Sequence, residues 1–153
     1  MPVFGCLLTA IRATLLLMLV CAPFNPASAK FYGYVRFFER TNFDDDGAEY
    51  WYYTADSNRC INLSCFEDKA SSVKWKNLPT TASFDKDGWA KIAFFTGANC
   101  TGTKREWKTE EEGYPYDLSK DGIDNAISSF IIYETGRSSK GNMLPCPWGH
   151  NLF

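Results

Sequence analysis

Residues 30–134 consist of short runs in which apolar and polar side chains alternate, separated by polar turns that contain glycine. In residues 31–39, Val35 and Phe37 fall on one face of an extended chain. The other face carries Tyr34, Arg36 and Phe38. This two-residue period is that of a β-strand, and no long stripe with a helical period competes with it. The pattern therefore predicts an all-β chain, with strands at residues 31–39, 48–54, 73–75, 89–95, 104–108 and 130–133.

The segments between these runs have turn compositions, rich in Asp, Asn and Gly. We expect loops at residues 40–49, 55–65, 77–81, 85–88, 97–102 and 110–113. The polar segment that ends at Asp124 has room for one helical turn but not for a helix of ordinary length. Residues 135–142 are rich in Gly, Ser and Lys and are expected to be a linker, whereas residues 143–153 regain apolar side chains and are expected to pack back on the domain.

One unit of the sequence occurs twice, at an offset of 57 residues. The segment from Glu67 to Ser72 (Glu-Asp-Lys-Ala-Ser-Ser) matches the segment from Asp124 to Ser129 (Asp-Asn-Ala-Ile-Ser-Ser). The same offset superposes Phe37 on Phe94, Phe38 on Phe95, Val35 on Ile92, Tyr50 on Trp107 and Val73 on Phe130. A duplicated unit predicts two similar halves that build one domain.

This doubling resembles the βγ-crystallin family, whose Greek-key motifs have an aromatic opening and a closing N/D-N/D-x-x-S/T-S calcium signature. The opening is matched in the first half by Phe38, Glu39, Phe43 and Gly47, with two inserted residues in the Asp44–Asp46 run. In the second half it is matched by Phe95, Thr96, Cys100 and Gly102, where Thr96 replaces the glutamate and Cys100 the aromatic residue. The resemblance implies a βγ-crystallin-like sandwich of two Greek-key motifs, at about residues 31–78 and 88–134, with about eight strands.

The same resemblance implies one or two calcium ions, each in a pocket that draws on both halves. The candidate ligands are the side chains of Glu67, Asp68, Ser71, Asp124, Asn125 and Ser128, together with carbonyls near Glu39, Lys69, Thr96 and Ala126. Carboxylate, amide, hydroxyl and carbonyl oxygens are all calcium ligands. The second serines, Ser72 and Ser129, are expected to tie the hairpins together.

The first signature departs from the family pattern at Glu67, and Lys69 places a cation beside it, so the pocket that depends on Asp124, Asn125 and Ser128 is expected to be the tighter one. The alternative is that both loops serve only the fold, with their Asp and Ser side chains satisfying backbone groups in a turn.

The first 29 residues have the layout of a secretory signal peptide: Arg12, an apolar run at residues 13–21 and small residues at 27–29. A transmembrane helix is the competing interpretation, but the apolar core is short for a bilayer and Pro23 and Pro26 interrupt its end. We expect a secreted, extracellular protein, with a signal at 1–29, a domain at 30–134 and a C-terminal tail at 135–153. The sequons at Asn62 and Asn99 are glycosylation acceptors if the source is eukaryotic.

Four of the six cysteines lie outside the predicted signal: Cys60, Cys65, Cys100 and Cys146. An even number in an exported domain predicts two disulfides, and three pairings are possible. We favour Cys60 with Cys65, which are close in the chain, and Cys100 with Cys146, which would tether the tail. A zinc site is the alternative, but paired C-x-x-C spacing is missing and the thiols would oxidise outside the cell.

The net charge and the lack of an active-site motif argue against nucleic-acid binding, lipid binding and catalysis. Removing residues 1–29 takes away one basic and no acidic residue, which leaves 15 basic and 18 acidic side chains. No basic stripe for a nucleic acid or for anionic lipid is visible. The one histidine is His150, and neither a triad of Ser71, His150 and an aspartate nor a carboxylate pair at Asp44 and Asp45 has the local sequence context of an active site.

We therefore expect a non-catalytic, secreted calcium-binding protein that calcium and disulfides stabilise. The alternative is a secreted toxin, antimicrobial protein, effector or protease inhibitor that uses the same scaffold to bind an extracellular protein or a cell wall. The segments that would make such contacts are the Asp44–Asp46 insertion, the acidic loop at residues 110–112 and the aromatic tail at 145–153.

Overall fold

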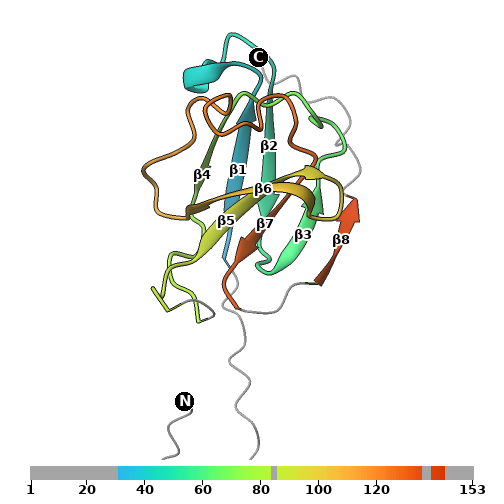
Figure 1. The fold of residues 1–153 in the computed structure, drawn as a ribbon. Helices are drawn as coiled ribbons and strands as arrows, with labels where there is room; N and C mark the ends of the chain where they lie inside the picture. The colour runs from blue at the N-terminus through green and yellow to red at the C-terminus, as the bar shows by residue number, and fades with distance from the viewer. Residues whose placement is uncertain (1–30, 84–85, 136–138, 144–153) are drawn as a thin grey trace, which may run out of the picture.

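The computed structural model describes residues 31–83, 86–135 and 139–143, and the chain forms two β-sheets packed face to face (Figure 1). The elements in chain order are β1 (Gly33–Phe38), the 3-10 turn η1 (Thr41–Phe43), β2 (Glu49–Thr54), β3 (Arg59–Asn62), β4 (Ser72–Lys76), β5 (Lys91–Gly97), β6 (Thr101–Lys108), β7 (Ser129–Tyr133) and β8 (Ser139–Met143). The predicted all-β sandwich with about eight strands is confirmed.

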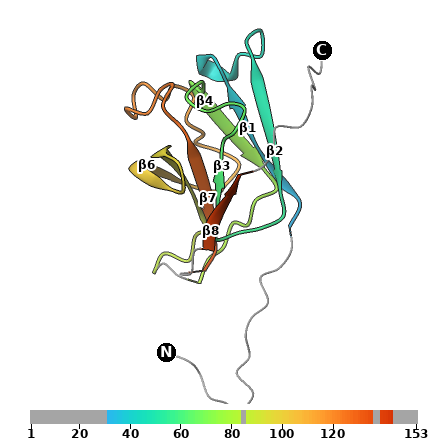
Figure 2. The same cartoon turned by 90° about the vertical axis from the view of Figure 1, so that its right-hand side faces the viewer.

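The two halves of the chain exchange a strand. One sheet has the order β2-β1-β4 and the other has the order β6-β5-β7-β3-β8, so that β3 of the first half pairs with β7 of the second. The exchange is reciprocal, because backbone amides of Val73 and Leu118 donate to the carbonyls of Pro115 (3.1 Å) and Ser71 (2.9 Å). The segment around Pro115 thus lies along β4 as β3 lies along β7, and Figure 2 shows the two layers edge-on.

The core fills the space between the sheets and consists mainly of aromatic and branched side chains. Val35, Phe37, Ile92 and Phe94 are fully buried there, as the alternation in β1 and β5 predicts. The Phe37 and Phe94 rings, which the 57-residue offset superposes, meet edge-on with centroids 5.8 Å apart. The most buried pairs of the repeat therefore pack against each other across the duplication, and this contact joins the halves into one domain.

The strand register corrects one of the residue pairs that the 57-residue offset matched. Tyr52 lies opposite Val35, and Trp107 lies opposite Ile92, so Tyr52 rather than Tyr50 is the counterpart of Trp107. The reason is the two-residue insertion in the Asp44–Asp46 run, which shifts the sequence offset within this part of the repeat.

Two strands lie where loops were expected. β3 lies inside the segment 55–65, and β8 lies inside the segment 135–142 that was predicted to be a linker, extending it by Met143. Both depend on partners far away in sequence: β3 pairs antiparallel with β7, and β8 pairs parallel with β3. The hydrogen bonds between paired strands are made by backbone groups alone. A short polar segment can therefore pair as a strand even when its side chains do not alternate between apolar and polar. The polar segment before Asp124 forms turns, with no helix among its described residues.

The disulfide pairing predicted from sequence was wrong. Cys60 bonds to Cys100, with the two Cα atoms 5.9 Å apart, and so joins β3 of the first half to the β5–β6 loop of the second. The five-residue link from Cys60 to Cys65 is not formed, because β3 runs extended from Arg59 to Asn62 and carries the chain away from Cys60. Cys65 is also disulfide-bonded.

Several sequence predictions concern residues that the structure does not describe. The signal segment 1–29, Cys146 and His150 lie outside the described ranges. Among the residues that are described, no helix is long and apolar enough to cross a membrane.

Candidate metal centre

The two closing loops have the same backbone hydrogen bonds at the 57-residue offset. The amide of Ser71 donates to the carbonyl of Phe38 at 2.8 Å, and the amide of Ser128 donates to the carbonyl of Phe95 at 2.9 Å. The duplicated sequence thus gives a duplicated local structure, and each first serine is fixed beside the end of its own opening strand.

The second serines hold the two hairpins in the same way. The hydroxyls of Ser72 and Ser129 donate to the carbonyls of Arg40 and Gly97, both at 2.6 Å. They also accept the backbone amides of Phe43 and Cys100, both at 3.0 Å. Both hydroxyls are fully buried and satisfy buried backbone groups. This confirms the prediction that Ser72 and Ser129 tie the hairpins together.

The loops cross, so each signature lies against the other half. The amide of Asp68 donates to the carbonyl of Ile127 at 3.1 Å, and the amide of Asn125 donates to the carbonyl of Ala70 at 2.9 Å. Asp68 and Asn125 both have positive φ values, 54° and 49°. Asp and Asn tolerate this left-handed conformation better than other non-glycine residues, which gives the signature a backbone reason for its acid or amide.

We define the Ser128 site as the hydroxyl of Ser128, the carboxylate of Asp68 and the carbonyl of Thr96. The Ser128 Oγ lies 3.1 Å from the Thr96 oxygen and 3.3 Å from Asp68 Oδ1. Since a hydroxyl has one proton, it satisfies one of these acceptors at a time. Three oxygens from three chain segments and both halves therefore converge on one point, around a side chain that is 5% exposed.

We define the Ser71 site as the equivalent positions at the 57-residue offset: Ser71, Asn125 and the carbonyl of Glu39. Ser71 is buried, but Asn125 is exposed and its amide donates to Asp124 Oδ2 at 3.1 Å. The other carboxylate oxygen, Asp124 Oδ1, is buried and has no hydrogen-bond partner among the described residues. The Ser71 site thus has a neutral amide where the Ser128 site has a carboxylate.

The six predicted ligands are therefore distributed differently from the expectation. Ser128 lies with Asp68, whereas the sequence grouped Ser128 with Asp124 and Asn125, which bond to each other. Because the loops cross, each hydroxyl meets the acid or amide position of the opposite signature. Glu67 is exposed, as is Lys69.

Thr96 keeps the local role of the glutamate that it replaces. The amide of Ala48 donates to Glu39 Oε2, and the amide of Thr103 donates to Thr96 Oγ1, both at 2.9 Å. The threonine at position 96 therefore preserves the hairpin, and the Thr96 carbonyl is directed at Ser128.

Two of the three carboxylates in the Asp44–Asp46 run have arginine partners. The carboxylates of Asp44, Asp45 and Asp46 lie within 4.8 Å of one another, but Arg40 lies 3.4 Å from Asp44 and Arg36 lies 3.7 Å from Asp45. The Asp46 amide, and secondarily Arg40, hold the pKa of Asp44 below its usual value.

The acidic loop at 110–112 also supports the fold. The carboxylate of Glu111 accepts the backbone amide of Asn77 at 2.8 Å, and the carbonyl of Glu110 accepts the indole N–H of Trp75 at 3.2 Å. The Asp44–Asp46 run and the loop at 110–112, which the sequence suggested as contact surfaces, thus both make contacts within the domain.

Comparison of the sequence with protein-family models and with curated proteins gives no significant match. Comparison with solved structures gives several. A βγ-crystallin from an archaeon is 23% identical, with a TM-score of 0.43 over 65% of this chain and 95% of that one. A βγ-crystallin domain from Clostridium beijerinckii is 19% identical, with a TM-score of 0.40 over 66% and 98%.

A third structure, a βγ-crystallin domain from Flavobacterium johnsoniae, is 12% identical, with a TM-score of 0.43 over 68% of this chain and 98% of that one. The chain is thus similar in structure, at low sequence identity, to βγ-crystallin domains of bacteria and an archaeon, the family that its sequence resembles.

Proposed function

We propose that this domain binds calcium at the Ser128 site and acts as a non-catalytic module that calcium and disulfides stabilise. The observation that carries the proposal is the convergence of a hydroxyl, a carboxylate and a carbonyl oxygen, with Ser128 Oγ 3.1–3.3 Å from the other two. Such a set of hard oxygen donors, with one negative charge, suits calcium better than a metal that prefers nitrogen or sulfur.

The site supports weak rather than tight binding. Calcium takes about six to eight oxygen ligands, and the Ser128 site offers three from the protein, so water or further carbonyls such as that of Ala126 would complete the shell. Extracellular modules with dissociation constants on the order of 10⁻⁴ M or above are filled where calcium is abundant. The Cys60–Cys100 disulfide supports such an oxidising compartment.

Calcium bound across the halves would stabilise the folded state. An ion that binds only the folded chain stabilises it by RT ln(1 + [Ca]/Kd), which is about 1.4 kcal/mol at ten times Kd. For a domain of about 100 residues this raises the melting temperature by about 6–10 °C. The test is a thermal melt of the oxidised protein in calcium and in chelator, with calorimetric titration of the same sample.

The Ser128→Ala variant should lose most of the shift, and Ser71→Ala serves as the matched control at the equivalent position. Both remove one buried hydroxyl, so a general loss of stability affects both alike. Equal melting temperatures of the wild-type protein with and without calcium, together with no heat of binding, would overturn the proposal.

The non-catalytic part of the proposal rests on the hydrogen-bond partners of Ser128 within the described residues, among which there is no histidine. Ser71 and Ser128 are both buried, and the one histidine of the sequence is His150. The oxygens near Ser128 belong to a carboxylate and a backbone carbonyl, an arrangement that binds a cation or a proton and does not generate a serine nucleophile in the way that a Ser-His pair does.

A further inference from the structure

The outer face of the β2-β1-β4 sheet has an aromatic cluster that neither the core nor the calcium site uses. Tyr34 lies opposite Tyr53 in the β1–β2 pairing, and its ring centroid is 4.6 Å from that of Trp51 and 6.1 Å from that of Tyr53. Tyr53 is 73% exposed and Tyr32 is 83% exposed. Outward positions of a sandwich are usually polar, so a row of exposed rings indicates a contact surface.

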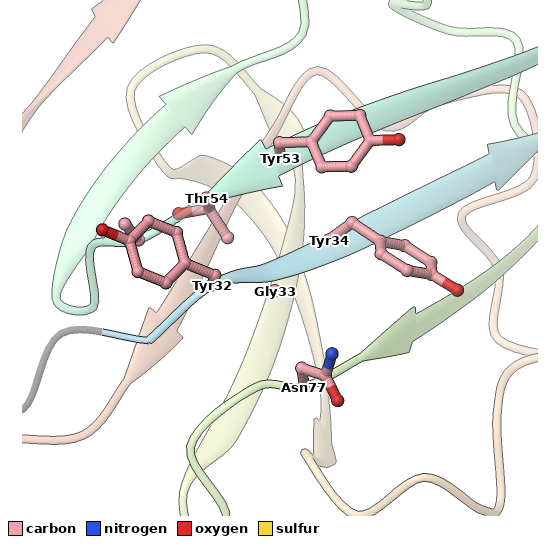
Figure 3. Close-up of a pocket in the computed structure, with 7 residues that line it drawn as sticks. Tyr32, Gly33, Tyr34, Tyr53, Thr54 and Asn77 are labelled. Atoms are coloured by element: carbon pink, nitrogen blue, oxygen red, sulfur yellow. The ribbon is translucent and has the colours of Figure 1, made fainter.

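At the end of this row the rings surround a groove of about 420 Å³. Figure 3 shows the rings of Tyr32, Tyr34 and Tyr53 around the strand ends of β1 and β2, with the Asn77 amide approaching from the end of β4. Gly33 is part of the lining at the start of β1, where a Cβ would lie 2.7 Å from the backbone carbonyl of Asn77, so β1 and the end of β4 approach closely at this point. The volume falls in the range of small-molecule sites, which is about 300–1,000 Å³.

The lining specifies the chemistry of the ligand. None of the lining residues is charged, so a phosphate, carboxylate or ammonium group would find no counter-ion in the groove. Polar groups are nevertheless present, because the lining includes the Asn77 side-chain amide and the phenol groups of Tyr34 and Tyr53. They can both donate and accept.

The arginine of this face, Arg36, is already committed. Its guanidinium lies between the rings of Phe38 and Trp51, at 4.4 and 4.7 Å, and is paired with Glu49. Lys76 of β4 pairs with a groove tyrosine and is exposed. One lysine beside the groove is fewer cations than a polyanion site uses.

We propose that this groove binds the sugar rings of a neutral oligosaccharide. A pyranose has an apolar face of C–H groups, which carry slight positive charge and pack on the electron-rich face of an aromatic ring. Its rim of hydroxyls matches the phenol oxygens and the Asn77 amide. The aromatic row continues from the groove towards Trp51, so a chain ligand meets more aromatic surface than a single sugar does.

The test is calorimetric titration of the oxidised protein with chitohexaose, cellohexaose and laminarihexaose, and with a heparin hexasaccharide as the anionic probe. We expect at least one neutral hexasaccharide to bind, and Tyr53→Ala to weaken that binding tenfold or more. Tyr53→Phe keeps the ring and should retain most of the affinity. Tyr116→Ala removes an exposed tyrosine from a different loop, 47% exposed, and should leave binding unchanged.

The proposal is overturned if no neutral hexasaccharide binds, if heparin alone binds, or if Tyr116→Ala weakens binding as much as Tyr53→Ala does. A dimer seen by sedimentation and abolished by Tyr53→Ala, without sugar binding, would assign the face to a second copy and equally overturn it. Since Tyr53 is exposed, Tyr53→Ala should melt close to the wild-type temperature, and Ser128→Ala should bind the sugar normally.

Discussion

The first and second halves of the domain have nearly the same backbone around their closing loops but different side chains at the decisive positions. The paired hydrogen bonds of Ser71 and Ser128 agree to within 0.1 Å, as do those of Ser72 and Ser129. Yet Asp68 faces the Ser128 hydroxyl, whereas its counterpart Asn125 bonds to Asp124. The serines and turns thus maintain the duplicated backbone, while the calcium affinity that we propose would differ between the halves through one acid or amide.

The opening hairpins differ as well. In the first half Phe43 packs on Phe38 and on Tyr114, with centroids 5.8 and 6.1 Å apart. In the second half Cys100 takes the place of Phe43 and forms the disulfide with Cys60. One hairpin is held by aromatic packing and the other by a covalent bond, although the two loops share positive φ values of 57–59° at Asn42, Phe43, Asn99 and Cys100.

The largest expected effect comes from breaking that covalent bond. Cys60→Ser with Cys100→Ser should destabilise the fold by about 4 kcal/mol, because the disulfide closes a loop of about 40 residues and restricts the unfolded chain. Urea unfolding of the double variant measures this loss. Phe43→Leu, which trims the equivalent aromatic contact of the first half, is the comparison and should cost clearly less. A double variant as stable as the wild type would show that the second hairpin does not depend on its disulfide.

The next prediction exchanges the acid and the amide of the two sites. Asp68→Asn should weaken calcium binding at the Ser128 site about tenfold, which corresponds to about 1.4 kcal/mol, since it removes the one carboxylate there. Asn125→Asp should raise the affinity of the Ser71 site. The double exchange should move the stronger binding from one site to the other, leaving the number of ions unchanged. Calorimetric titrations of the three variants test this.

Both substitutions keep an Asp or Asn at a position of positive φ, so they preserve the backbone conformation. If Asp68→Asn left calcium affinity unchanged while Ser128→Ala abolished it, the carboxylate would not be a ligand and the difference between the two halves would lie elsewhere.

The sequence was sufficient to predict the features that are local or repeated. Alternation in residues 31–39 placed Val35 and Phe37 in the core, and the Ser-Ser pairs at the 57-residue offset located both closing loops. The features that it did not predict are the long-range ones. β3 exists because β7 lies beside it, and Cys60 meets Cys100 only after the halves have exchanged strands.

The candidate site shows the same limit. All six candidate ligands were chosen from the two signatures, and the resemblance implied pockets that draw on both halves, but it grouped Ser128 with Asp124 and Asn125 and not with Asp68. The groove of Tyr32, Tyr34 and Tyr53 was missed because aromatic residues in a strand are expected in the core, and only the register shows which of them face outward.

The smallest expected effect is a loss of stability at alkaline pH, which compares Tyr52 with its counterpart in the second half. Burial, followed by the neighbouring Tyr50, raises the pKa of Tyr52 to about 12, whereas its counterpart Trp107 does not ionise. The folded-state pKa lies above the unfolded value of about 10, so this contribution to stability is complete below pH 10 and is lost as the pH rises towards 12. Linkage gives a loss on the order of 1 kcal/mol at pH 10.5.

Tyr52→Phe should remove the part of this pH dependence that comes from Tyr52, because the hydroxyl that accepts the Ser64 amide is gone and nothing ionises at that position. Denaturant unfolding at pH 8 and pH 10.5 measures it, as the difference between the two pH values in variant and wild type. Tyr114 also has its pKa raised to about 12 by burial and by Glu111, so Tyr114→Phe tests whether the alkaline loss comes from the first half alone. An unchanged pH difference in Tyr52→Phe would mean that the burial of Tyr52 does not make the first half sensitive to alkali.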